Sequence, residues 1–193
     1  MTRVYFVRHA QPEHDWEEDR TRPLTEEGKK DSAIVLGFLK DKKIDAFYCS
    51  PYKRSMDTIA EAADFFTKEI ITDERLRERE KGPDGNNYGM FQKRWADHDY
   101  HEEGGESIAM VQKRNIEALN EILSDNTDKD IVIGTHGTAL STILNFYDSN
   151  FGCEDFLRII DWMPYIIELD FEGDKLVGKH EHCYVEKEFK GNQ

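Results

Sequence analysis

The sequence contains only three cysteines, Cys49, Cys153 and Cys183, and they are far apart. An odd, widely spaced set gives neither a disulfide framework nor the CxxC pattern of a zinc site. Long apolar runs are also missing, because no segment approaches the roughly 18 residues that a membrane span requires. The chain begins without a basic stretch followed by an apolar one, so we expect no signal peptide and a cytoplasmic protein.

Positive charge is scarce as well, since 26 lysines and arginines stand against 40 aspartates and glutamates, a net charge of −14. Nucleic acids and anionic membranes are bound mainly through lysine and arginine, so neither is expected as a partner. Seven histidines and many carboxylates leave a metallohydrolase open as an alternative. No HExxH or similar ligand spacing occurs, however, and we expect neither a metal nor another cofactor.

Apolar periodicity predicts strands that alternate with helices. With 193 residues and 38% hydrophobic content, the chain is expected to form a single domain, residues 1–193. Strands are predicted at 3–8, 44–50, within 69–76 and at 130–135, a hairpin at 165–183, and helices at 24–42, from Pro51, at 104–125 and at 138–147. This order predicts an α/β fold, a three-layer α/β/α sandwich around a mostly parallel sheet. Residues 77–104 are charged and irregular, and we expect a loop or lid there.

Ligands of such folds bind beyond the carboxyl ends of the strands. Three predicted strand ends carry polar side chains, namely Arg8 with His9, Ser50 to Arg54, and Thr135 with His136 and Gly137. Because parallel strands end at the same edge of a sheet, we expect these groups to lie close together. Two histidines with at least two arginines would make an anion site that contains a nucleophile.

Phosphoryl transfer matches this set of groups. A neutral imidazole can attack phosphorus, and arginine binds the phosphoryl oxygens through a bidentate, permanently charged contact. A carboxylic acid is then needed to protonate the leaving oxygen and later to activate water. Three glutamates of the segment "DERLRERE" are candidates for this acid, Glu74, Glu78 and Glu80.

Several motifs occur in an order that resembles a known family. They are "VRHAQ" at 7–11, "PLTEEGKKDSAIVLGFL" at 23–39, "YCSPYKRSMDTIAEA" at 48–62, "ERLRERE" at 74–80, "GGES" at 104–107 and "IVIGTHG" at 131–137. From Val4 to about Ile143, the chain resembles the histidine phosphatase superfamily, the phosphoglycerate-mutase-like proteins. The resemblance implies a phosphoglycerate-mutase-like fold and metal-independent hydrolysis of a phosphomonoester.

The resemblance also implies a role for each candidate catalytic residue. His9 would be the nucleophile that forms a phosphohistidine, and Arg8 and Arg54 would bind the phosphoryl oxygens. His136 would complete the pocket as a hydrogen-bond donor. Glu78 lies at the position of a Leu-x-Glu motif, so it would be the proton donor.

Further positions are implied for the acid and for the substrate. Glu74 and Glu80 are the alternatives if the alignment of this loop shifts. Gln11 follows the Arg-His signature and is expected to contact substrate. Gly137 and Thr138 begin a helix, where free backbone N–H groups favour an anion.

The segment after His9 departs from the family pattern. Ala10 replaces the usual glycine, and Pro12 and Asp15 occupy positions where the family often has threonine and asparagine. The acidic loop 13–22 therefore leaves the contacts to the rest of the substrate open.

Side chains outside these motifs are expected to be structural or solvated. The histidines His14, His98 and His101 lie in polar loops, while His180 and His182 share one face of the late hairpin. The aromatic residues Tyr88, Phe91, Trp95 and Tyr100 are expected to form a satellite cluster, with a lid over the substrate as the alternative.

The expected substrate is a small phosphorylated metabolite. A phosphoglycerate-type mutase, a non-catalytic binding relative and a two-histidine RNA phosphoesterase are the alternatives. The short segment between Glu78 and His136 favours hydrolysis over the mutase, and an intact nucleophile and acid argue against a pure binder. The identity of the substrate and the oligomeric state stay open.

Overall fold

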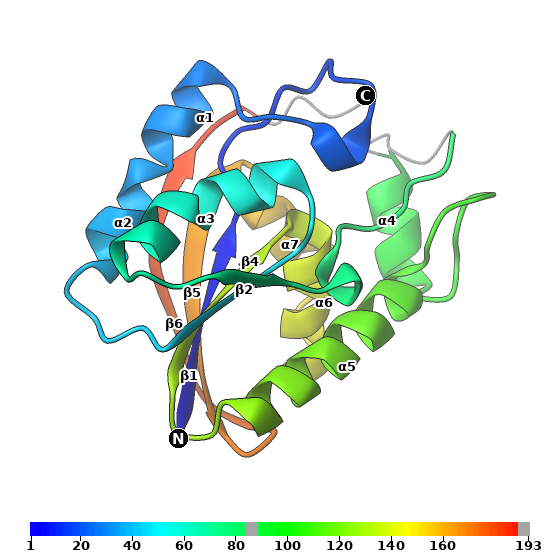
Figure 1. Ribbon diagram of the computed structural model, residues 1–193. Coiled ribbons are helices and arrows are strands. Elements are labelled where there is room, and N and C mark those ends of the chain that lie inside the picture. The colour runs from blue at the N-terminus through cyan, green and yellow to red at the C-terminus, as the bar shows by residue number, and fades with distance from the viewer. Residues whose placement is uncertain (84–88, 189–193) are drawn as a thin grey trace.

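The fold is built on one sheet of six strands in a computed structural model that describes residues 1–83 and 89–188. The strand order is β3-β2-β4-β1-β5-β6 (Figure 1). The strands are β1 (Thr2–Arg8), β2 (Ala46–Cys49), β3 (Ile70–Thr72), β4 (Asp130–Thr135), β5 (Trp162–Glu172) and β6 (Lys175–Glu186). The first four run parallel, and β5 and β6 add an antiparallel hairpin at one edge. The predicted mostly parallel α/β sheet is therefore confirmed.

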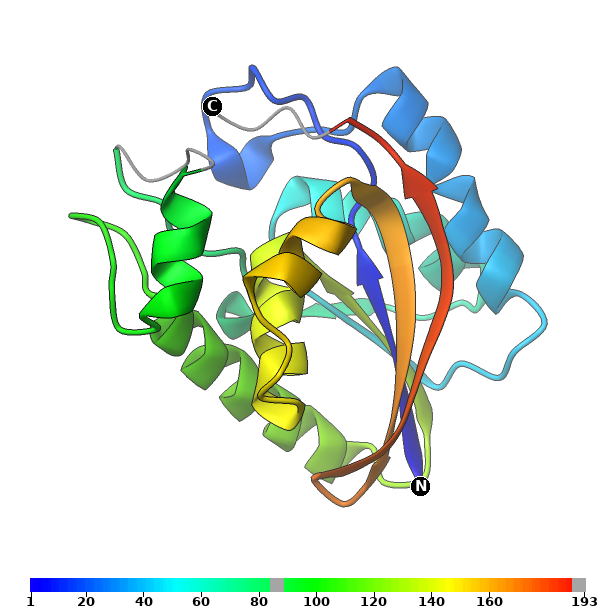
Figure 2. The ribbon, with the colours of Figure 1, turned by 180° about the vertical axis from the view of Figure 1, so that it is seen from behind.

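Helices cover both faces of this sheet, which confirms the predicted three layers. One face carries α1 (Glu26–Asp31), α2 (Ala33–Leu39) and α3 (Lys53–Phe65). The other carries α5 (Ile108–Asp125), α6 (Gly137–Tyr147) and α7 (Cys153–Ile159), with α4 (Gly89–Ala96) beside α7 (Figure 2). The short 3₁₀ helices η1 (Asp19–Thr21) and η2 (Glu74–Leu76) lie in loops. No helix among the described residues is long and apolar enough to cross a membrane.

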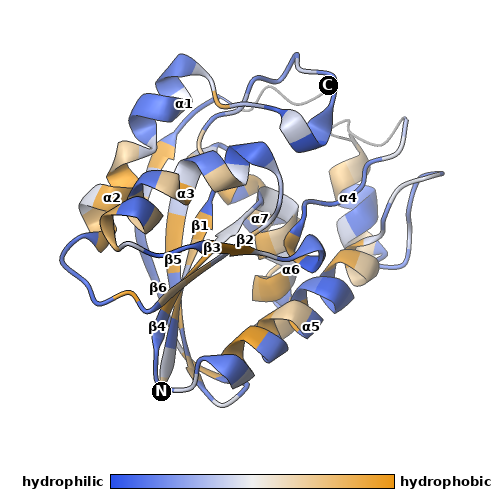
Figure 3. Cartoon of the chain, in the orientation of Figure 1, coloured by the Kyte–Doolittle hydropathy of each residue, from blue (hydrophilic) through white to orange (hydrophobic). Residues whose placement is uncertain are grey.

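The two helical layers create two separate cores, because neighbouring side chains of a strand point to opposite faces. Val4 and Phe6 of β1 pack with α5, α6 and α7, whereas Tyr5 and Val7 pack with α2 and α3. Figure 3 shows the hydrophobic residues gathered on the strands and on the helix sides that face them. The central strands are thereby buried on both faces, and their ends lie at fixed positions.

Several elements differ from the prediction. The helix expected at 24–42 is interrupted at Ser32, whose hydroxyl donates to the carbonyl of Lys29 at 2.6 Å and so competes with the helical pattern. The expected irregular segment 77–104 contains α4, and α7 was not predicted. Phe91 and Trp95 belong to the main core and not to the separate satellite cluster that was expected. Tyr88 lies outside the described residues.

Candidate active site

The carboxyl ends of β1, β2 and β4 meet at one edge of the sheet, as their sequence predicts. Arg8 of β1 pairs with Thr135 of β4, so His9 and His136 follow at adjacent positions. Their ring centroids are 5.2 Å apart. An open cavity of about 110 Å³ lies at this edge, and its lining includes six of the predicted site residues: Arg8, His9, Arg54, Glu78, Gly137 and Thr138.

His9 is held as a neutral imidazole with one nitrogen available. Its Nδ1 lies 2.7 Å from the carbonyl oxygen of Ala10. Because a carbonyl only accepts hydrogen bonds, Nδ1 carries the proton and Nε2 keeps its lone pair. Burial, then the charges of Arg54 and Arg8, hold the pKa of His9 well below its usual value. A neutral ring beside cations is the form of histidine that can act as a nucleophile.

The backbone around His9 accommodates its unusual neighbour Ala10. Ala10 is fully buried, and its N–H donates to the hydroxyl of Thr58 at 3.0 Å. Its backbone does not have a positive φ. The absence of the family's glycine therefore imposes no backbone strain at this position.

Arg8 is fastened on one side and faces the cavity on the other. Its Nη1 donates to three backbone carbonyls, those of Ile159, Ile160 and Trp162, at 2.7, 2.9 and 3.2 Å. Gly137 lies directly against the guanidinium, because a Cβ there would be 3.1 Å from Cζ and from Nη2. Burial lowers the pKa of Arg8 to about 10, so the group is still a cation at neutral pH.

Arg54 reaches the cavity from the first turn of α3. Its side chain is 4% exposed and forms an ion pair with Oδ1 of Asp19 at 3.1 Å. The carbonyl of Asp19 also accepts its Nη1 at 2.7 Å. The same carboxylate pairs with Arg22 at 3.2 Å. Asp19 of the acidic loop thus positions two arginines at the cavity, and Asp15 lines a separate surface hollow.

His136 lies behind the cavity lining and is completely buried. Its Nε2 is 2.8 Å from the hydroxyl oxygen of Ser50, which also accepts the N–H of Tyr52 at 3.2 Å. If Ser50 donates to Nε2, the proton of the neutral ring lies on Nδ1, an atom with no hydrogen-bond partner in the described chain. Burial, then Arg54 and His9, hold the pKa of His136 well below its usual value. The ring is therefore neutral and can donate one hydrogen bond.

Of the three candidate glutamates, only Glu78 lines the cavity. Its Oε2 accepts the N–H of Thr138 at 3.0 Å, and its Oε1 accepts the N–H of Ala139 at 3.0 Å. Glu74 is exposed and pairs with Arg20, and Glu80 is also exposed. The structure thus brings Glu78 to the site and leaves the two alternatives outside it.

The three predicted substrate contacts have different surroundings. Gly137 and Thr138 line the cavity, but the N–H of Thr138 already donates to Glu78. The side-chain oxygen of Gln11 accepts the hydroxyl of Thr25 at 3.0 Å, and Gln11 is not part of the cavity lining. The helix N-terminus is therefore occupied by a carboxylate of the chain itself, and Gln11 ties the loop to the start of α1.

Several lining residues were not expected from the sequence. They are Asp19, Arg22, Arg79, Lys81, His14 and the apolar side chains Pro12, Phe91, Phe156, Ile160 and Met163. His14 was expected to be exposed but is half-buried. Five cations now face the cavity against two carboxylates, so a chain with a charge of −14 has a local cationic site. Arg22 and Arg79 carried no sequence signal, because they lie in irregular segments.

Arg79 is the most enclosed of these additional cations. It is 6% exposed, and burial followed by the charge of Arg94 lowers its pKa to about 10. Its Nη1 lies 3.1 Å from the carbonyl of Glu80 and 3.6 Å from a carboxylate oxygen of Glu102. These contacts hold the guanidinium of Arg79 in place, and it adds a further cation to the cavity lined by Arg8 and Arg54.

Comparison with known proteins identifies the same family that the sequence motifs resemble. The family model "Histidine phosphatase superfamily (branch 1)" matches residues 4–175. The chain is 26% identical to "Putative phosphoserine phosphatase 2" of Hydrogenobacter thermophilus, with 96% of this chain and 98% of that protein covered. It is 27% identical to "Phosphoserine phosphatase 1" of the same organism, with 70% of this chain and 71% of that protein covered.

Solved structures share the fold over almost the whole chain. A phosphoserine phosphatase of Entamoeba histolytica, determined in complex with phosphoserine, has a TM-score of 0.76 at 22% identity, with 95% of this chain and 96% of that chain covered. Bacillus stearothermophilus YhfR has a TM-score of 0.76 at 22% identity, with 92% and 95% covered. At these identities, the similarity establishes the architecture of the sheet and its helical layers.

Proposed function

The chain belongs to the histidine phosphatase superfamily, and from this premise we propose that it hydrolyses a small phosphomonoester through a phosphohistidine on His9. Family membership and the names of the relatives support phosphatase activity. One observation carries the proposed mechanism. The imidazole of His9 is neutral, has its Nδ1–H bound to a carbonyl, and leaves Nε2 available beside Arg8 and Arg54.

In the first step, the Nε2 lone pair of His9 forms a bond to phosphorus. The bond between phosphorus and the ester oxygen breaks, and the leaving oxygen takes a proton from the carboxyl group of Glu78. Arg8 and Arg54 bind the oxygens of the transferring phosphoryl group, where negative charge is concentrated. With Ser50 donating to its Nε2, His136 has an Nδ1–H that can donate to the same group.

In the second step, water attacks the phosphohistidine. Glu78, now a carboxylate, takes a proton from the water, and the new oxygen–phosphorus bond forms as the nitrogen–phosphorus bond breaks. His9 regains its lone pair, and inorganic phosphate leaves. The sum of both steps is ester plus water to alcohol plus phosphate, which requires no redox partner.

We propose a phosphorylated carboxylic acid as the substrate. Arg8 and Arg54 suffice for the phosphoryl group, and the lining contains three more cations, Arg22, Arg79 and Lys81. Arg22 and Arg79 already pair with Asp19 and Glu102, and a second anionic group on the substrate would add a further charged contact to this cationic lining. Phosphoserine, after which the two Hydrogenobacter relatives are named, belongs to this class.

A rate assay tests the proposed activity. The protein should hydrolyse p-nitrophenyl phosphate in the presence of EDTA, and His9→Ala should abolish the reaction. Activity that is lost to the chelator and restored by a divalent metal would contradict the proposal.

A mutase is the second candidate, because a 55-residue segment is 44% identical to a 2,3-bisphosphoglycerate-dependent phosphoglycerate mutase of Thermoplasma acidophilum. A panel of phosphorylated acids that includes 3-phosphoglycerate separates the two. Release of inorganic phosphate supports the phosphatase, whereas accumulation of 2-phosphoglycerate without phosphate release supports the mutase.

A further inference from the structure

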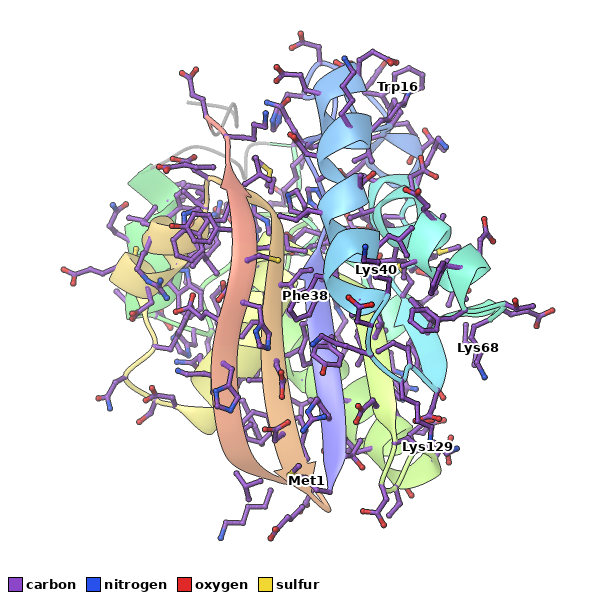
Figure 4. The ribbon with its side chains drawn as sticks, turned by 90° about the vertical axis from the view of Figure 1, so that its left-hand side faces the viewer. Met1, Trp16, Phe38, Lys40, Lys68 and Lys129 are labelled. Carbon is purple, nitrogen blue, oxygen red and sulfur yellow. The ribbon has the colours of Figure 1, made fainter. Side chains whose placement is uncertain are left out.

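Two carboxylates and two histidines gather on the face of the sheet that also carries α1 and α2. Glu168 and Asp170 are two residues apart on β5, and His180 and His182 are two residues apart on β6, so each pair shares one face. The register places Glu168 opposite His180. In Figure 4, α1 and α2 cover the upper part of this face, and no described helix covers the lower part, toward Met1.

The ligand-type atoms of this cluster lie close to one another. Nε2 of His182 is 2.5 Å from Oε2 of Glu168, and Nε2 of His180 is 3.7 Å from Oδ2 of Asp170. One such atom from each of Glu168, Asp170 and His180 lies within 4.8 Å of the other two. One imidazole nitrogen and two carboxylate oxygens thus converge on one small volume, and His182 contacts the Glu168 carboxylate beside it.

One guanidinium, that of Arg3, contacts the carboxylates of the cluster and a third carboxylate beside them. Arg3 is 2.7 Å from Oε1 of Glu168, 3.3 Å from Oδ1 of Asp170 and 3.2 Å from Oδ2 of Asp130. This single guanidinium stands against three carboxylates, two of which have side chains only 10% and 11% exposed. Arg3 binds one oxygen of each buried carboxylate, and the other oxygen of each faces an imidazole.

The surroundings leave room for the cluster and orient one ring. A Cβ at position 178 would be 2.8 Å from Oδ2 of Asp170, so Gly178 opens the space that this carboxylate occupies. The ring of Phe38 packs against that of His182 with centroids 4.7 Å apart. Neither contact involves the cavity at the carboxyl ends of the strands.

We propose that Glu168, Asp170 and His180 bind one zinc ion, with His182 holding the Glu168 carboxylate in place. Imidazole nitrogens with carboxylate oxygens are ligands suited to zinc, whereas magnesium and calcium prefer oxygen ligands alone. The ligands bind zinc as carboxylates and a neutral imidazole, so any proton that they carry leaves to water on binding. The ion joins β5 to the edge strand β6, so its role is structural and independent of the proposed phosphatase chemistry.

Calorimetric titration of zinc into the full chain, freed of metal with a chelator that is then removed, tests this site. We expect one equivalent bound per chain, no comparable binding of magnesium, and a rise in Tm with zinc. His180→Ala and His182→Ala should each weaken zinc binding by about tenfold or more and remove the rise in Tm. His101→Ala, which removes an exposed imidazole elsewhere, is the matched control and should bind zinc like the wild type.

Two results would overturn the proposal. One is the absence of zinc binding by the wild type at micromolar concentrations. The other is equal affinity in the wild type and in the double variant His180→Ala with His182→Ala, which would place the ion elsewhere. Hydrolysis of p-nitrophenyl phosphate by the same variants shows that they are folded, because His180 and His182 lie outside the cavity lining.

Discussion

Glu78 binds the backbone of Thr138 across 60 residues of sequence, with its Oε2 accepting that N–H at 3.0 Å. Its Oε1 accepts the next N–H, that of Ala139, at 3.0 Å. The contact fixes the segment after η2 to the N-terminus of α6, where the helix dipole attracts a negative group. A carboxylate at this position lies in the cavity that also holds His9.

Replacement of Glu78 by glutamine should remove the proton transfer to the leaving oxygen while keeping a side chain of nearly the same shape. We expect the rate on an alkyl phosphate to fall by about 10²–10⁴-fold. The loss on p-nitrophenyl phosphate should be smaller, because nitrophenolate leaves without a proton. Glu74→Gln is the control, since Glu74 is exposed outside the cavity. Equal losses on both substrates would argue against Glu78 as the acid.

Asp19→Ala should weaken substrate binding, because the carboxylate positions both Arg54 and Arg22. Loss of one such charged contact is worth about 1.5–3 kcal/mol, so KM should rise by about tenfold or more. Steady-state kinetics check this result. Asp15→Ala, in the same loop but outside the cavity lining, should leave KM unchanged. An unchanged KM in Asp19→Ala would mean that other contacts position the two arginines.

Gly137→Ala should displace Arg8 from the phosphoryl site. The new Cβ would lie 3.1 Å from Cζ of Arg8, whose guanidinium is fastened to three carbonyls and has little room to move. We expect kcat/KM to fall, with the fold shown intact by circular dichroism. Gly37→Ala is the matched control, because nothing lies within 4 Å of its Cβ. That change should stabilise α2 by about 0.5–1 kcal/mol and leave activity unchanged.

Stability should depend on pH through His9 and His136. Burial and nearby cations hold the pKa of both rings well below 6.5 in the folded chain. The unfolded chain takes up protons as the pH falls through about 6.5, and the folded chain does not. The contribution of the two neutral rings to the free energy of unfolding is therefore complete above about pH 6.5. It is lost at lower pH, by up to about 1.4 kcal/mol per pH unit for each ring.

Urea denaturation between about pH 7 and about pH 5.5 measures this dependence. His9→Ala should reduce the slope of the unfolding free energy against pH by about one proton. His101→Ala, which removes an exposed imidazole, should keep the wild-type slope. A slope that is the same in His9→Ala and in the wild type would contradict the neutral, buried state of His9.

The sequence predicted those parts of the site that depend on strand ends. Arg8 ends one apolar strand, and His9 and His136 follow two strands whose parallel pairing brings their ends together. Arg54 lies in the first turn of the helix predicted after Pro51, which begins at Lys53. Local pattern therefore determines where these groups lie. The same reasoning missed the break at Ser32, because a hydroxyl bonding back to the backbone is a local effect that apolar periodicity does not report.

The parts that could not be predicted lie in irregular segments. Arg22 and Arg79 belong to stretches of mixed charge that are typical of solvated loops, yet Arg22 is half-buried and Arg79 is buried. Asp19 pairs with Arg22, and Glu102 lies beside Arg79. Such partners are far apart in sequence or embedded among similar residues, so neither spacing nor composition identifies them. The histidines of β6 were expected to be solvated for the same reason, although His182 contacts Glu168.

Trapping of the covalent intermediate tests the central claim most directly. The wild type would be mixed with a ³²P-labelled phosphomonoester, quenched within a turnover, and digested to locate the label. We predict phosphate that is labile in acid, stable in base and attached to His9, with no label in His9→Ala and increased label in a variant slow in the second step. Rapid turnover without any such adduct, or label on another residue, would contradict the phosphohistidine mechanism.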